Sequence, residues 1–139
     1  AKKLVGCPAI VGDIGSATNY DVIDEKGAFI GGSIAPGPET AARNLFEKGA
    51  LLKETTFTLP DSIIGKDTVT NLQSGIMMGA IDAIDGMFAR IQFESGWENP
   101  NTIITGGFGE IISPHLKTKH TLIPTLTLDG IQIIYEKTR

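Results

Sequence analysis

The chain has 139 residues, of which 41% are hydrophobic and 20% charged, with a formal net charge of −4. This composition supports one globular domain, or one lobe of a larger one, and excludes a disordered chain. No apolar run approaches the roughly 20 residues of a membrane helix. The 12 basic residues are scattered, which argues against a nucleic-acid surface. Cys7 is the single cysteine, so there is no internal disulfide, and with isolated His115 and His120 it makes no convincing zinc site. A reduced, cytoplasmic location is therefore expected.

The first third of the sequence predicts an antiparallel meander. An apolar, β-branched run over Ala9–Ile14, ended by Gly15, predicts a buried strand. Tyr20–Asp24 and Ala28–Ile34 predict two further strands. The connections are short, and Gly27 suits a tight turn between the second and third strands.

Two helices are predicted next. Pro38 and Glu39 suit the first turn of a helix that continues to Gly49. Residues 51–59 are ambiguous, and 61–65 fit either a loop or a short strand. Asp67 is a plausible N-cap for a helix over Thr68–Phe93, which would be about 39 Å long at 1.5 Å per residue. The apolar stripe expected on its inner face comprises Val69, Leu72, Ile76, Ala80, Ala83, Met87 and Ile91.

The same long helix contains Gly75, Gly79 and Gly86. Each costs about 1 kcal/mol relative to alanine, which suggests a compensating close contact, for example with the same helix of a second subunit.

The last third predicts a strand over Thr102–Thr105, a short helix over Glu110–Ile112, a strand over Thr121–Ile123 and a last helix over 126–135. Together these elements predict an α/β fold, in which a meander and a mixed sheet pack against helices.

Polar residues in the first hairpin form the first candidate site. The loop Asp13-Ile14-Gly15-Ser16-Ala17-Thr18-Asn19 joins two predicted strands. Its backbone N–H groups could form an anion-binding nest, and Asp13 could hold a cation that neutralises phosphate charge. The alternative is a polar hairpin whose hydroxyls satisfy their own turn.

Two further segments are candidates. The glycines of Thr105-Gly106-Gly107-Phe108-Gly109 would let an adenine or ribose lie against the main chain, or would simply allow a turn with positive φ. Thr68, at the start of the long helix, could contact a polar substrate, or could belong to an ordinary helix cap.

Taken in order, these segments resemble type III pantothenate kinase. The resemblance covers essentially the whole chain and rests on Gly12–Asp21, Gly31–Gly37, Ile64–Val69, Gln73–Ile76 and Thr105–Gly107, with a tail similar over Leu126–Ile131 and Ile134–Glu136.

The resemblance implies a fold of the acetate-kinase/actin/sugar-kinase type, with two ribonuclease-H-like lobes and ATP between them. It implies transfer of the ATP γ-phosphoryl group to pantothenate, the first step of coenzyme A biosynthesis. The glycines of the long helix add the expectation of a homodimer. Residues 1–139 resemble the ATP-binding C-terminal lobe alone. The N-terminal lobe, with its Asp-x-Gly-Asn-Thr and Gly-x-Asp-Arg patterns and its catalytic Asp, is absent. The chain starts at Ala1 and not at Met, as expected if it begins downstream of those patterns, and we expect no useful kinase activity from it alone.

The same resemblance implies roles for particular residues, although it places no catalytic residue in this chain. ATP, with Mg²⁺, and a monovalent cation (potassium or ammonium) are the implied cofactors. The family usually has Thr at the position of Ser16 and often has Thr at that of Asn19. The implied contacts are Asp13 with the cation, Ser16 with an ATP phosphate, Gly106 and Gly107 with the adenosine, and Thr68 with pantothenate. Thr18 would line the same ATP-binding loop as Ser16. The alternative function is a catalytically silent, kinase-like accessory or regulatory protein that acts as a dimerisation module.

Overall fold

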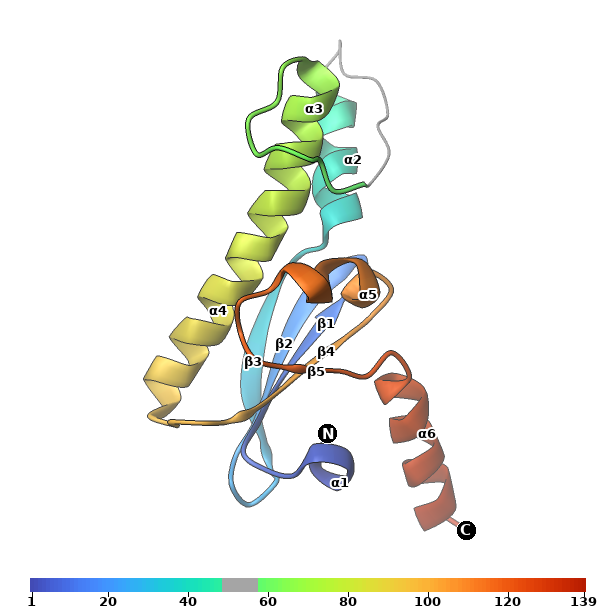
Figure 1. Ribbon diagram of the computed structural model, residues 1–139. Helices are drawn as coiled ribbons and strands as arrows, with labels where there is room; N and C mark the ends of the chain where they lie inside the picture. The colour runs from blue at the N-terminus through green and yellow to red at the C-terminus, as the bar shows by residue number, and fades with distance from the viewer. Residues whose placement is uncertain (49–57) are drawn as a thin grey trace.

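The computed structural model describes residues 1–48 and 58–139 as a mixed α/β fold (Figure 1). The predicted helix end at Gly49 and most of the ambiguous run 51–59 lie outside the described residues. The elements are α1 (Lys2–Val5), β1 (Ala9–Ile14), β2 (Ala17–Ile23), β3 (Phe29–Pro36), α2 (Pro38–Lys48), α3 (Thr68–Gln73), the π-helical turn η1 (Ser74–Met78), α4 (Gly79–Ser95), β4 (Asn101–Thr105), α5 (Gly109–Ile112), the 3₁₀ turn η2 (Ser113–His115), β5 (Thr121–Leu122) and α6 (Leu126–Lys137).

In residues 1–48 and 58–139, the strands form one five-stranded sheet in the order β3-β2-β1-β4-β5. The predicted meander is confirmed, since β1 pairs with β2 and β2 with β3, both antiparallel. β2 begins earlier than predicted, at Ala17, because Ile14 pairs directly with Thr18 and leaves only a tight loop between the strands. β4 lies parallel to β1 on its other side, and β5 lies parallel to β4.

α3, η1 and α4 follow one another without a break and form a single helical rod (Figure 1). The predicted N-cap is confirmed: the Asp67 carboxylate accepts a hydrogen bond from the backbone N–H of Thr70 at 2.8 Å. The π-helical turn was not predicted. A π turn holds one more residue than an α turn, so it rotates everything that follows relative to an uninterrupted helix.

The rotation changes which residues of the rod are buried. Ile76 is buried as predicted, but beyond the π turn the buried residues are Ile81, Ile84 and Phe88. Each comes one position after a residue of the predicted stripe. Ala83, which the stripe placed inward, is exposed.

The core lies between α4 and one face of the sheet. Phe88 meets the Tyr20 ring edge-on, with centroids 5.7 Å apart and an interplanar angle of 86°. A Cβ atom on Gly12 would lie 2.8 Å from the Phe88 ring, so this glycine is what allows α4 to approach the central strand so closely. The buried members of this core cluster are Ile10, Ile14, Tyr20, Ile81, Ile84, Phe88, Ile104 and Ile112.

The C-terminal elements attach to this core in different ways. Asp85 of α4 accepts backbone hydrogen bonds from Lys117 and Thr118, both at 2.9 Å, and so ties the segment before β5 to the rod. The predicted last helix is confirmed as α6, which has no buried residue and extends away from the sheet (Figure 1). In the described part of the chain, no helix is both long and apolar enough to span a bilayer.

Candidate functional site

The first hairpin and the glycine turn after β4 lie against each other. The backbone N–H of Phe108 donates to the carbonyl of Ile14 at 2.9 Å. Gly106 has φ +92°, and a Cβ atom there would lie 2.5 Å from both Asp13 Oδ1 and the Ile14 carbonyl oxygen. Only glycine fits such a position. Two segments about 90 residues apart in the sequence therefore meet at the end of β1.

The hairpin loop itself is held by the start of α2. The Ser16 carbonyl accepts hydrogen bonds from the Gly37 N–H at 3.0 Å and from the Thr40 hydroxyl at 2.6 Å. Gly37 has no room for a side chain, because a Cβ atom would lie 2.0 Å from the Gly15 carbonyl oxygen. These contacts fix the loop backbone and leave the residue Ser16 exposed, so its hydroxyl is available to a ligand.

Asp13 lies in an electrostatically unfavourable place for a carboxylate. Partial burial, together with the negative charge of Asp21, raises the pKa of Asp13 above its ordinary value. Asp21 is on the same face of the sheet, because it pairs with Val11, two residues before Asp13. A positive ion beside Asp13 would relieve both effects. Among the described residues, no group of three or more His, Cys, Asp or Glu side chains is arranged to hold a metal ion.

Two predicted site residues are not grouped with Asp13. Thr18 is only 5% exposed, and it pairs with Ile14, so its side chain lies on the core face of the sheet and not on the face that carries Asp13. Thr68 is exposed at the start of α3, at the end of the rod farthest from the sheet (Figure 1). Gly107 does adjoin the site, and a Cβ atom there would meet nothing within 4 Å.

Sequence reasoning did not assign a role to two neighbours of Asp13. Thr105 of β4 and Asn19 of β2 are its register partners on either side. The signal for Asn19 was available, since a tight hairpin fixes which residues face each other. The partner from β4 depends on a long-range parallel pairing that residue patterns do not specify.

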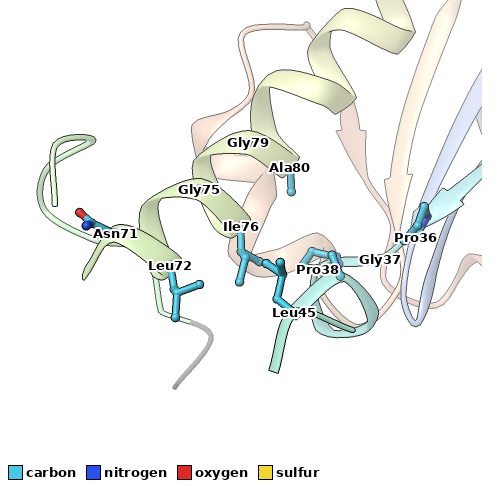
Figure 2. Close-up of a pocket in the computed structure, with 11 residues that line it drawn as sticks. Pro36, Gly37, Pro38, Leu45, Asn71, Leu72, Gly75, Ile76, Gly79 and Ala80 are labelled. Carbon is cyan, nitrogen blue, oxygen red and sulfur yellow. The ribbon is translucent and has the colours of Figure 1, made fainter. Parts of the chain in front are cut away.

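A separate apolar groove of about 470 Å³ lies between α2 and the rod (Figure 2). Leu45 of α2 and Leu72 and Ile76 of the rod line it, together with Gly75 and Gly79. Within the described chain, a Cβ atom on either glycine would meet nothing within 4 Å. The predicted close contact of these glycines is therefore not made inside the described part of the molecule.

The fold and the loops meeting at Asp13 define a mixed α/β protein with a glycine-lined loop site, and comparison with known proteins shows its family. The sequence model of type III pantothenate kinase matches residues 1–90. The type III pantothenate kinase of Agathobacter rectalis is 40% identical over 137 residues, which cover 99% of this chain and 53% of that protein. That of Moorella thermoacetica is 42% identical over 135 residues, covering 97% of this chain and 53% of that protein. The chain belongs to the type III pantothenate kinase family.

The chain spans about half the length of the curated relatives it matches. A crystal structure from Campylobacter jejuni, whose name assigns it to a Baf family of transcriptional activators, matches with a TM-score of 0.66 and 21% identity. The match covers 94% of this chain and 58% of that one. At this identity the similarity concerns the fold alone.

Proposed function

We propose that this chain is the ATP-binding portion of a pantothenate kinase, which transfers the γ-phosphoryl group of ATP to pantothenate at the start of coenzyme A biosynthesis. The observation that carries the proposal is the meeting of the hairpin loop and the Gly106 turn at Asp13, in a chain whose curated relatives bear this enzyme's name. Those names favour the kinase over a silent accessory protein.

The proposed architecture is a single ribonuclease-H-like lobe of the actin-like ATPase type, comprising residues 1–139. The catalytic base then belongs to the half of the relatives' length that this chain does not match. The proposal also includes a cytoplasmic location and a homodimer, in which the rod glycines Gly75 and Gly79 face the second copy.

The chemistry of the site suits phosphoryl transfer, which depends on alignment and charge neutralisation more than on covalent catalysis. In the proposal, the exposed Ser16 hydroxyl donates to an ATP phosphate, and ATP brings its own Mg²⁺. Gly106 and Gly107 border the adenosine, and the open space where a Gly107 side chain would lie leaves room for a flat group. Thr18, which is buried on the core face, is proposed to line the same loop from below the nucleotide.

Asp13 is proposed to hold potassium or ammonium, and its surroundings fit such an ion. One carboxylate among neutral oxygens suits a single positive charge, whereas a divalent ion usually takes more carboxylate ligands. The ion would neutralise Asp13 and reduce its repulsion of phosphate.

Thr68 is proposed to contact pantothenate. It lies on a different element from the Asp13 site, so the acceptor would approach from the α3 end of the rod. This role is separable by experiment from ATP binding, because a Thr68→Ala variant should bind ATP as the wild type does.

The proposal is tested by titrating Mg-ATP into the chain by calorimetry. Gly107→Val should weaken ATP binding about tenfold or more, because its side chain enters space that the adenosine would occupy, while the fold has room for it. Gly86→Val is the matched control, since it too adds atoms in open space but lies on the rod. Absence of ATP binding by the wild type, or equal binding by Gly107→Val, would contradict the proposal. Pantothenate-dependent ADP formation by this chain alone would show that it needs no further lobe.

A further inference from the structure

Three polar side chains lie in a row across the sheet at the proposed cation site. Asp13 of β1 pairs with Asn19 of β2 on one side and with Thr105 of β4 on the other. Residues paired across neighbouring strands place their side chains on the same face, with Cβ atoms about 4.5–5.5 Å apart. The row therefore presents an amide, a carboxylate and a hydroxyl side by side.

Within the described part of the chain, none of these three side chains makes a hydrogen bond. The side-chain hydrogen bonds of the described residues are made by other residues. This is most unusual for Thr105, which is only 2% exposed. Buried hydroxyls are nearly always hydrogen-bonded. Among the described residues, every side-chain oxygen that is completely buried has a hydrogen-bond partner. Because the Thr105 hydroxyl has none, it must be in contact with a small solvent-accessible space.

The order of the groups shows what kind of ligand would occupy that space. Hydroxyl and amide donors alone would suit an anion, but the carboxylate at the centre of the row repels one. The charge of Asp21 on the same face adds to this repulsion. A cation, in contrast, can take the carboxylate, the amide oxygen and the hydroxyl oxygen together as ligands.

We infer that Asn19 and Thr105 are oxygen ligands on either side of Asp13 in the seat of a monovalent cation. The inference rests on the proposed function, because it completes the ligand set of the ion proposed there at Asp13. It also gives a role to Asn19, whose side-chain amide supplies an oxygen beside Asp13.

The inference is tested by measuring thermal unfolding of the 139-residue chain against KCl concentration, at constant ionic strength with choline chloride, with and without Mg-ATP. Binding of potassium to the folded state raises the unfolding temperature. Thr105→Val and Asn19→Leu should each weaken the apparent potassium affinity about tenfold, since each removes an oxygen ligand. Thr105→Ser should stay near the wild type. Thr102→Val should do so too, because it makes the same change in the same strand on the opposite face.

The outcomes separate this inference from the proposed function. If Asp13→Asn abolishes the potassium response while Thr105→Val and Asn19→Leu keep it, the inference is overturned and the assignment of Asp13 stands. If the wild type does not respond to potassium with or without ATP, the cation seat is overturned. The ATP affinity of the same samples then decides separately whether the nucleotide site remains.

Discussion

Gly106 and Gly107 are neighbours in the sequence, but their surroundings are opposite. A side chain at Gly106 would collide with Asp13 and with the Ile14 backbone, and its φ of +92° suits only glycine. A side chain at Gly107 would meet nothing within 4 Å. Substitutions at Gly106 therefore test the packing of the turn, whereas substitutions at Gly107 test the proposed ligand contact.

Gly106→Ala should lower the free energy of unfolding by about 2–4 kcal/mol, because backbone strain and a clash with main-chain atoms act together. Gly107→Ala is the control and should change it by less than about 1 kcal/mol. Urea denaturation measures both. Equal effects of the two variants would show that the turn does not pack against β1 as described.

Asp13 makes a second residue-scale prediction, which concerns pH. Its pKa is raised by burial and then by the charge of Asp21, so Asp13 takes up a proton more readily in the folded protein than in the unfolded chain. Its favourable contribution is thus complete below the ordinary pKa of 3.8 and is lost as pH rises through the higher pKa of the folded state. Asp13→Asn should therefore be more stable than wild type at pH 7 in potassium-free buffer.

The gain from Asp13→Asn should disappear as pH falls toward 3.8. Denaturation midpoints between pH 3 and pH 7 measure it. Asp85→Asn should behave in the opposite sense. Burial acts to raise the pKa of Asp85, but hydrogen bonds from Lys117 and Thr118 more than offset this and lower it, so Asp85 stabilises the fold near neutral pH. A gain for Asp85→Asn at pH 7 would contradict the assigned contacts.

At the scale of elements, the rod shows where sequence periodicity fails. Residues that recur at steps of three and four correctly predicted the helix, and Asp67 correctly predicted its start and its cap. They did not predict the π turn, because one extra residue in one turn leaves no mark on composition. Beyond it, the observed inner face lies one residue later along the chain, at Ile81, Ile84 and Phe88.

The shifted face predicts opposite results for two adjacent residues. Ile84→Ala should lower the free energy of unfolding by about 3 kcal/mol, because it opens a cavity in the core cluster. Ala83→Glu should change stability by no more than about 0.5 kcal/mol, because Ala83 is exposed. Urea denaturation of both variants decides between the two faces, since the uninterrupted helix predicts that Ala83→Glu is the damaging change.

At the scale of the whole molecule, the pairing of neighbouring strands in the chain was predictable from the residues, whereas the register of strands far apart in the chain was not. The meander was predictable because its strands are joined by short turns. The row of side chains at Asp13 was not predictable. Thr105 joins it through the parallel pairing of β1 with β4, and the chain between these two strands includes the whole rod. Sequence reasoning therefore named Asp13 and Gly106 as candidate site residues, but not the two side chains that flank Asp13 in the proposed cation site.

α6 makes the whole-molecule prediction. Its apolar side chains are uncovered, with Leu128 68% and Ile134 64% exposed. Such a face promotes association. Ile131→Lys/Ile134→Lys should leave the unfolding temperature nearly unchanged, because α6 has no buried residue, and should reduce association in sedimentation velocity runs at increasing concentration.

Thr127→Lys/Gln132→Lys is the matched control, since it adds the same charge to α6 without removing apolar surface. If both double variants reduced association equally, net charge would be responsible and not the apolar face.

The single residue between β3 and α2 has a mechanical consequence. β3 ends at Pro36 and α2 begins at Pro38, so Gly37 alone connects them, and it is packed against Gly15 and bonded to Ser16. This connection is too short and too closely packed to move independently of its neighbours. A ligand that displaces the hairpin loop is therefore expected to change the position of α2 as well.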